Sequence, residues 1–555
     1  MTPADRALAG RDSESGRWWL KVAAPAAVLA VALLPFWGLW RAPGPPMEEG
    51  FMLVFPELVL RGEIPNRDFL HLYGPGSLWM LAGVYRIFGV ALEVERAVAF
   101  VQQLGVAFGV FVAIRPWGRW VAAAGASVAA VIVIPPVGLT ALAWPAAVAL
   151  GLWAIHAALR AADASPPARD RLFVLAGLGA AASLLFRPDL VVGLGLSGVV
   201  LLRVVRTRRD RVRLLAGLGG GLALYVVHVA MAGPRAVFNG ILVEPVFKLR
   251  GGRRLPLPPS WDHFDGFLQL AGDTVAPPWP LPAPPSPAQL SLWIVLIVVT
   301  LIVLVTGGML ASRRGDKRLL VFAVFAVGLL PQALQRADSA HLAWVSCVPL
   351  GLLPAAIIEL RRAKVSPSPR FVLAAALAPA LLTLAIVPHF TWRTYGDYTA
   401  QSVGLHREVH TISHNGRRFF YGRKDAVDAV HALLRDVEQV AEPGDRLFVG
   451  TGDLRKTPYS EAFLYYLLPE LPPATRYIEM DPGVANASDS GLARDLASAD
   501  VVILSSIRDD WDEPNDSRLF GDDGPNAVLA ETFCLVSSHG VGLFGRGLYE
   551  LYVRC

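Results

Sequence analysis

Apolar residues dominate the chain up to about residue 390 in long runs, which short polar segments separate. A helix needs about 20 such residues to cross the hydrocarbon of a bilayer. The pattern predicts about eleven membrane-spanning helices, at residues 22–40, 96–114, 120–136, 143–160, 172–187, 189–203, 214–232, 290–311, 319–335, 341–360 and 371–389. Segment 75–91 is apolar but short and broken by glycine, so it is either a twelfth span or a helix lying at the membrane interface.

Residues 390–555 follow a different pattern. Apolar positions such as Val427, Val430 and Leu434 have the spacing of an amphipathic helix over 423–440. Strands are predicted at 446–450, 475–480 and 500–506, with helices between them at 459–468 and 490–499. Such alternation is typical of a small α/β domain. The domain has no G-x-G-x-x-G stretch and no P-loop, so a nucleotide site is not indicated.

The composition excludes a soluble or a disordered chain. Hydrophobic residues make up 54% of the 555 residues and charged residues 17%, whereas soluble domains carry about 25% charged residues. Disorder requires low hydrophobicity. We therefore predict a polytopic α-helical membrane protein of the plasma membrane. A cytoplasmic N-terminus (1–21) precedes a transmembrane module (22–389), and an extracytoplasmic α/β domain (390–555) follows it.

The positions of the basic residues predict the orientation. If 75–91 does not cross, the basic clusters all lie on one side, at 6–21, 115–119, 160–171, 203–213, 313–318 and 361–370. The positive-inside rule assigns that side to the cytoplasm. The outer side then receives loop 41–95, loop 233–289 and the tail. Because the net charge of +5 is spread over several loops, no nucleic-acid partner is expected, and the expected surroundings are membrane lipid.

Four polar clusters lie on the predicted outer side, where polar residues in an apolar protein are informative. They are Glu48 and Glu49 with Arg67, Asp68 and His71; Arg187-Pro188-Asp189; Arg336, Asp338 and His341; and Glu244, Lys248, Arg250, Arg253 and Arg254. Each also has a structural explanation, as a solvated loop, a turn-capping ion pair, a polar hairpin or surface charge.

Cations and carboxylates on one face suit sugar transfer from a lipid phosphate. A carboxylate can act as the base for an acceptor hydroxyl. The phosphate leaving group is a stable anion and needs cations rather than a general acid. The apolar membrane-spanning part of the chain would hold a polyprenyl tail.

These residues resemble a known family. Glu48-Glu49-Gly50, RGEIPNRDFLHLYGPG (61–76), Arg187-Pro188-Asp189 and the 336–341 stretch are similar to outer-face motifs of GT-C membrane glycosyltransferases. The similar branch is the bacterial one related to protein mannosyltransferases and aminoarabinose transferases. The resemblance covers about residues 20–390 and agrees with an interfacial helix at 75–91.

The resemblance implies an inverting transfer from a polyprenyl-phosphate sugar to a lipid-linked glycan, polysaccharide or protein. Most members need no metal or other cofactor, some use a divalent ion, and both modes stay open here. The usual base maps to Glu48, but Glu-Glu replaces the family's Asp-Glu pair, so Glu49 stays an alternative. Donor phosphate or substrate ligands would come from Arg67, Asp68, His71, Arg187, Asp189, Lys248, Arg336, Asp338 and His341. The tail is expected to shape acceptor access and to take no part in the chemistry.

Two other classes of protein stay open. A secondary transporter is disfavoured because no inverted repeat and no matched pair of broken helices is visible. A non-catalytic scaffold of the same fold would have lost the base, and Glu48 and Glu49 are both present.

The chain has three cysteines, and two of them fall in the predicted outer domain. Between Cys534 and Cys555 the sequence predicts a strand, a glycine-rich turn and a second strand. Antiparallel strands of this length could bring the two ends within disulfide reach, in a compartment that permits disulfides. Two unrelated thiols are the alternative. Cys347 lies within a span and is expected to be an inert buried thiol.

Overall fold

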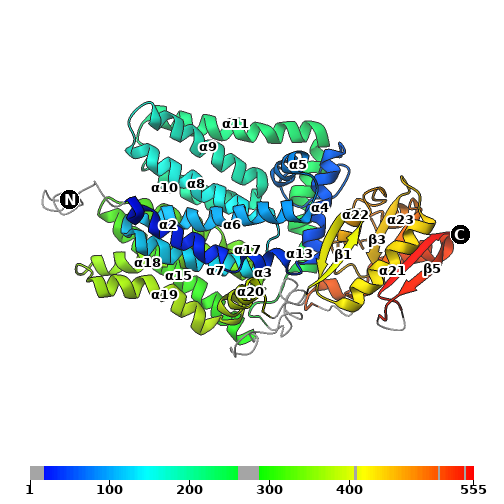
Figure 1. The fold of residues 1–555 in the computed structure, drawn as a ribbon. Helices are drawn as coiled ribbons and strands as arrows, with labels where there is room; N and C mark the ends of the chain where they lie inside the picture. Colours follow the sequence, from blue (N-terminus) through cyan, green and yellow to red (C-terminus); the bar gives the residue numbers. More distant parts are fainter. Residues whose placement is uncertain (1–17, 260–286, 406–408, 510–512, 543–545) are drawn as a thin grey trace.

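The computed structural model describes residues 18–259, 287–405, 409–509, 513–542 and 546–555. Long helices form a bundle, and a mixed α/β domain packs on one end of it (Figure 1). The bundle comprises α2 (Trp18–Leu33), α3 (Phe36–Arg41), α6 (Leu92–Ile114), α7 (Arg119–Val137), α8 (Ala143–Asp163), α9 (Ala168–Phe186), α10 (Val191–Leu201), α11 (Arg208–Ala232), α15 (Pro287–Arg313), α16 (Arg318–Val327), α17 (Leu330–Gln335), α18 (Ser339–Arg362) and α19 (Pro369–Ile386).

The described residues contain eight helical segments that are long and apolar enough to cross a membrane. Two shorter apolar helical segments, at 119–135 and 188–201, coincide with predicted spans. Helix α9 covers the predicted span at 172–187 but begins with Arg169, Asp170 and Arg171. The multi-pass helical fold is therefore confirmed, and the count of eleven spans stays a prediction.

The basic loops lie together at the bundle end opposite the α/β domain. Contacts between them join Arg318 to Asp163 at 2.7 Å, Arg213 to Asp170 at 2.8 Å, Lys317 to the Arg203 carbonyl at 3.0 Å, and Trp117 to Glu359 at 2.7 Å. Their common location is what the positive-inside pattern requires. Which compartment they face stays a prediction.

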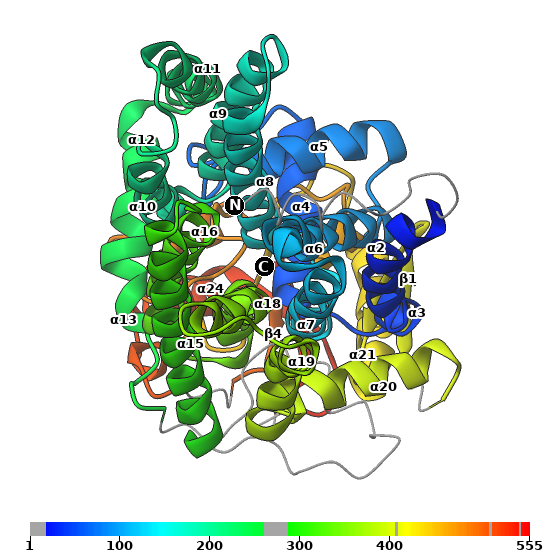
Figure 2. The ribbon, with the colours of Figure 1, turned by 90° about the vertical axis from the view of Figure 1, so that its left-hand side faces the viewer.

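Short helices cover the other end of the bundle. The predicted outer loop 41–95 contains α4 (Pro46–Leu60) and α5 (Gly76–Phe88), and α5 lies across the bundle direction (Figures 1 and 2). The predicted loop 233–289 contains α12 (Pro234–Phe238), the π-helix η3 (Asn239–Lys248) and α13 (Leu249–Arg253), and residues 260–286 lie outside the described part. Segment η4 (His389–Arg393) and helix α20 (Thr394–Ser402) lead out of the bundle, and α20 packs on α3.

The C-terminal domain has a four-stranded mixed sheet in the order β3-β4-β6-β5. Strands β3 (Leu447–Thr451) and β4 (Val501–Ser505) are parallel, and β6 (Tyr549–Arg554) is antiparallel to both β4 and β5 (Phe533–His539). A separate hairpin joins β1 (His410–His414) to β2 (Arg417–Tyr421). The helices are α21 (Lys424–Val440), α22 (Phe463–Leu467), α23 (Leu492–Ala497) and α24 (Gly524–Thr532).

Most predicted elements of this domain are present, and one is wrong. Helix α21 buries Val427, Val430 and Leu434 as its periodicity predicts. The predicted strand at 475–480 does not form. Its backbone pairs instead with the membrane module, where the Leu70 amide donates to the Arg476 carbonyl at 2.9 Å.

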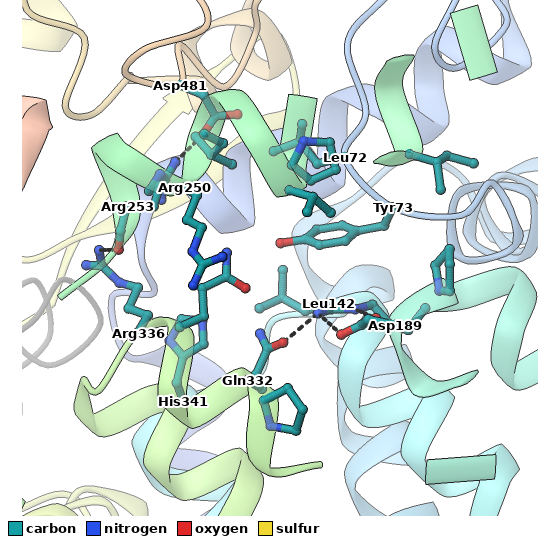
Figure 3. A pocket seen from close by; sticks show the side chains of 18 of the residues that line it. Leu72, Tyr73, Leu142, Asp189, Arg250, Arg253, Gln332, Arg336, His341 and Asp481 are labelled. Carbon is teal, nitrogen blue, oxygen red and sulfur yellow. Dashed lines mark hydrogen bonds and ion pairs between the residues drawn. The ribbon is translucent and has the colours of Figure 1, made fainter. Parts of the chain in front are cut away.

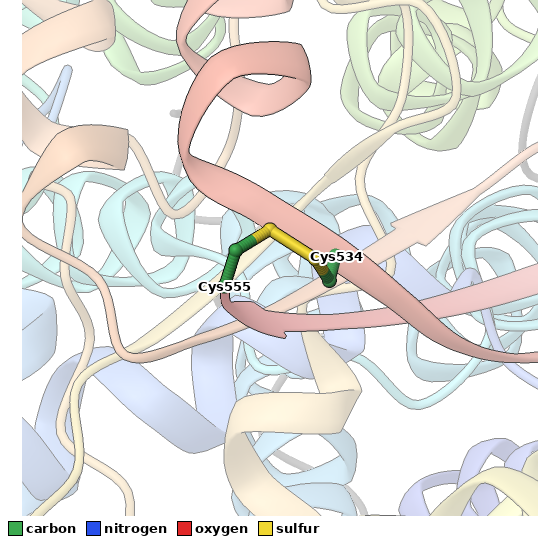
Figure 4. The surroundings of a disulfide bond; sticks show 2 residues. All are labelled: Cys534 and Cys555. Carbon is green, nitrogen blue, oxygen red and sulfur yellow. A yellow bond between two sulfur atoms is a disulfide. The ribbon is translucent and has the colours of Figure 1, made fainter.

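Cys534 and Cys555 are joined by a disulfide at the ends of paired strands β5 and β6 (Figure 4). Their Cα atoms are 5.1 Å apart. The bond ties Cys555, which follows β6, to β5. Cys347 is a buried free thiol in α18.

The domain docks directly on helix α4. At Gly50 an added Cβ would lie 2.4 Å from the Phe463 backbone nitrogen, so only glycine permits this approach of α4 to α22. On the same helix, both carboxylate oxygens of Glu57 accept 2.8 Å hydrogen bonds from Arg417. Helix α4 therefore carries Glu48 into the junction between the domain and the bundle.

Candidate active site

A cavity of about 480 Å³ lies at this junction (Figure 3). Its wall combines residues of α4, η3, α13, α17 and α18 with residues 479 and 481 of the C-terminal domain. One part of the lining is apolar, and four arginines and four acidic side chains make up much of the rest. The combination suits a ligand that has both an anionic group and an apolar portion.

Glu48 lines this cavity from the first turn of α4. Pro46 starts the helix, at a position where a missing N–H costs nothing. The Tyr459 hydroxyl donates a 3.2 Å hydrogen bond to the Glu48 carboxylate and accepts a 3.1 Å one from the Met47 amide. Burial raises the pKa of the Glu48 carboxyl above its ordinary value, and Arg253 opposes part of that rise. The result is a partly desolvated carboxylate that can accept a proton.

Glu49 points elsewhere, because successive side chains on a helix are about 100° apart. Its carboxylate receives two hydrogen bonds from Arg96, at 2.7 and 2.9 Å. Arg96 also donates to the carbonyls of Leu39 and Trp40. Both side chains of the pair are at most 2% exposed. Of the predicted acidic pair, only Glu48 lies in the cavity lining.

Arg187 and Asp189 both line the cavity, and they pair with each other. Arg187 precedes a proline and has an extended backbone, which ends α9. Its guanidinium donates to Asp189 at 2.9 and 2.8 Å and to Gln332 at 3.0 Å, and it lies 4.3 Å from the centre of the Tyr73 ring.

Arg336 lines the cavity and connects three parts of the chain. It donates to Asp338 at 2.5 Å, to the Arg253 carbonyl at 3.1 Å and to Glu513 of the C-terminal domain at 2.7 Å. Asp338 caps α18 by accepting from the His341 amide at 2.8 Å, and it contacts the His341 ring at 2.7 Å. Burial would raise the pKa of Asp338, but His341 and Arg336 hold it well below its ordinary value. His341 is part of the cavity lining. Asp338 is outside the lining and orients the side chains of Arg336 and His341 through these contacts.

Two further arginines enter the cavity from the fourth predicted cluster. Arg253 pairs with Asp481 and lies 3.6 Å from Glu479. Arg250 is exposed and extends toward the centre of the cavity (Figure 3). Among the described residues, none is recorded as a hydrogen-bond or ion-pair partner of the Arg250 side chain, so Arg250 is the cation most available to a ligand.

The structure does not bring four of the predicted binding residues into this lining. Arg67 and Asp68 pair with each other at 2.8 Å, and Asp68 accepts from the Ile64 amide at 2.8 Å. His71 is buried, and burial lowers its pKa to about 3, which keeps the ring neutral. Lys248 is exposed and faces Asp489 at 3.4 Å.

Sequence reasoning missed the contribution of the C-terminal domain. Tyr459, Glu479, Asp481 and Glu513 lie in or directly behind the cavity wall. Glu479 and Asp481 lie at or just after the end of the segment that was expected to be a strand, and no local signal marks them as site residues. The tail therefore contributes side chains to the candidate site itself.

Among the described residues, no three His, Cys, Asp or Glu side chains are grouped so that they could hold a metal ion. In the cavity, the carboxylates of Asp189 and Asp481 are paired with arginines.

Neither a protein-family model nor a curated protein sequence matches this chain. Among solved structures, it is similar to ArnT from Cupriavidus metallidurans bound to undecaprenyl phosphate, with 13% identity and a TM-score of 0.51, over 97% of this chain and 98% of that one. A weaker similarity, with a TM-score of 0.49 and 13% identity, joins 89% of this chain to 70% of the oligosaccharyltransferase AglB from Archaeoglobus fulgidus. The chain has the fold of the GT-C membrane glycosyltransferases.

Proposed function

We propose that this protein is a glycosyltransferase that moves a sugar from a polyprenyl-phosphate donor to a glycan or protein acceptor at the outer face of the plasma membrane. One observation carries the proposal: the Glu48 carboxylate and the guanidinium of Arg250, which has no partner among the described residues, line the same cavity beside an apolar wall. The fold likeness to ArnT, which was solved with undecaprenyl phosphate, supports the class of donor.

Arg250 is the first contact for the donor phosphate in this proposal. Arg187 and Arg336 line the same cavity, but both already donate to carboxylates, so they add positive potential and hold the wall in shape. A fork of N–H donors matches phosphate oxygens closely. The lipid chain would lie along apolar residues of η3 and α17, including Ile241, Val246 and Leu334.

Glu48 is the base. The acceptor oxygen attacks the anomeric carbon, the bond from that carbon to the phosphate oxygen breaks, and polyprenyl phosphate leaves with the electron pair. The acceptor proton passes to Glu48. Because attack and departure occur on opposite faces, the anomeric configuration inverts. Burial favours this role, because a carboxylate with a raised pKa holds a proton more readily.

The test measures release of polyprenyl phosphate by purified protein that is supplied with a panel of decaprenyl- and undecaprenyl-phosphate sugars and a cell-envelope acceptor fraction. Glu48→Gln should lower release at least about 100-fold, in the range of lost general-base catalysis. Glu63→Gln makes the same change just after α4, outside the cavity lining, and should keep wild-type release. Measuring release with and without EDTA shows whether transfer needs a divalent ion, as in some members of the GT-C family, or proceeds without one, as in most.

Donor binding is tested with undecaprenyl phosphate alone. Arg250→Ala should weaken its affinity about 10- to 100-fold, as expected for one charge-assisted contact. Arg254→Ala is the matched control, because Arg254 is exposed and is not in the lining. A wild type that neither binds undecaprenyl phosphate nor releases it from any donor would refute the proposed function and favour a transporter or a scaffold.

A further inference from the structure

Two buried carboxylates of the C-terminal domain, those of Glu479 and Asp481, face the cavity, and both lie near Arg253. Arg253 pairs with one oxygen of Asp481, and among the described residues the other oxygen, Oδ2, is buried without a partner. Glu479 lies 3.6 Å from Arg253, and in the described part of the chain no residue is recorded as a hydrogen-bond partner of its carboxylate. Both acidic side chains line the cavity although the residues are at most 8% exposed.

This arrangement is costly without a ligand. A buried polar group that makes no hydrogen bond loses its hydration without compensation. Burial and the neighbouring Asp481 raise the pKa of Glu479 well above its ordinary value, and the Glu48 charge adds to the rise. Three acidic groups from two parts of the chain therefore gather around Arg253, which interacts with all of them.

The charges around Glu479 and Asp481 indicate what kind of ligand can bind in that part of the cavity. An anionic phosphate would meet Glu48, Glu479 and Asp481 there. Gln332, to which Arg187 donates at 3.0 Å, lies across the cavity from Asp481 (Figure 3), and that side suits the phosphate better. An apolar group would leave the carboxylates unsatisfied. A ligand with several hydrogen-bond donors would satisfy both the free Asp481 oxygen and Glu479.

We propose that Glu479 and Asp481 form the subsite that binds sugar hydroxyl groups, next to the base and across the cavity from the phosphate side. The inference rests on the proposed function and gives the C-terminal domain a direct part in selecting the sugar. The hydroxyls belong either to the transferred sugar of the donor or to an acceptor glycan, and the two sources are separated by which substrate's KM responds.

The experiment compares the wild type with Glu479→Gln and Asp481→Asn, using the donor and acceptor that release polyprenyl phosphate in the assay above. Both variants should raise the KM of one sugar substrate by about 10- to 100-fold, as for a lost hydrogen bond to a charged group. The inhibition constant of undecaprenyl phosphate, which carries no sugar, should stay within about twofold. Asp489→Asn is the matched control, because Asp489 is exposed on the same domain and faces Lys248 outside the lining.

Two results would overturn the inference. Unchanged KM values for both substrates would show that Glu479 and Asp481 do not bind the sugar. A parallel rise in KM and in the inhibition constant would mean that they only hold Arg253 and shape the phosphate site. A wild type that releases no polyprenyl phosphate refutes the proposed function itself, whereas release with unchanged KM values refutes this subsite alone. If one variant fails to fold, as judged by its elution profile in detergent, the KM values of the other variant still test the inference.

Discussion

Replacement of Glu49 by Gln should affect folding, whereas the same replacement at Glu48 should affect chemistry. Glu49→Gln keeps the volume of the side chain but removes the charge that compensates Arg96. The guanidinium is 2% exposed, and both of its bonds to Glu49 are shorter than 3.0 Å. Water cannot replace the lost partner without opening the contact between α4 and α6.

The expected cost follows from this burial. Removing one partner of a buried ion pair destabilises by about 3–5 kcal/mol, because the remaining charge is left uncompensated. Gln can still accept one hydrogen bond, and the Leu39 and Trp40 carbonyls also hold Arg96, so the lower end, about 3 kcal/mol, is expected. Molecules that do fold should keep the cavity and most of their release activity.

Thermal stability in detergent, followed by fluorescence-detected size-exclusion chromatography, measures the effect. Glu49→Gln should lower the apparent Tm by several degrees, while Glu48→Gln should melt like the wild type and lose release. The double variant Glu49→Gln with Arg96→Gln should recover part of the loss, because it removes the uncompensated charge. Wild-type stability in Glu49→Gln together with complete loss of release would refute the reasoning and assign the base to Glu49.

Three further predictions concern the C-terminal domain. Tyr459→Phe removes a hydrogen bond that lowers the pKa of Glu48, so the pKa of Glu48 should rise and the acidic limb of the pH–rate profile should move to higher pH. An acidic limb at the wild-type pH would contradict a positioning role for the Tyr459 hydroxyl. Cys534→Ser should destabilise the domain by about 3 kcal/mol, as expected for a disulfide that closes a loop of about 20 residues. Denaturation with and without reductant measures the loss, and alkylation of both Cys534 and Cys555 in an oxidised preparation would exclude the bond. A topology reporter fused to the C-terminus should report the extracytoplasmic side, and a cytoplasmic signal would reverse the orientation.

The helical fold could be predicted because its signals are local. Runs of apolar residues identify spans without knowledge of their neighbours, and the same holds for the amphipathic period of α21. The strand expected at 475–480 failed for the opposite reason. A strand exists only when another strand pairs with it, and here the backbone of Arg476 pairs with Leu70 of the membrane module instead.

The site was less predictable because its parts are far apart in the sequence. The acidic pair could be recognised, but its two members could not be told apart without Arg96, which lies 47 residues from Glu49. Tyr459 reaches Glu48 across 411 positions. Arg250 belongs to a basic cluster that charge alone does not distinguish from surface charge. Only the folded cavity shows that its side chain has no partner in the described part of the chain.

Three contacts between the two domains make the C-terminal domain part of the candidate site. Arg336 with Glu513, Arg253 with Asp481, and Tyr459 with Glu48 each join one side chain of the membrane module to one of the tail. Without the tail, Glu48, the proposed base, would face water, which would lower its pKa toward that of a free carboxylate and let water compete as the acceptor. The same contacts hold Arg336 and Arg253 in the cavity wall. Residues of both domains therefore form the cavity, and the proposed chemistry depends on the tail as much as on the helices that are proposed to hold the lipid.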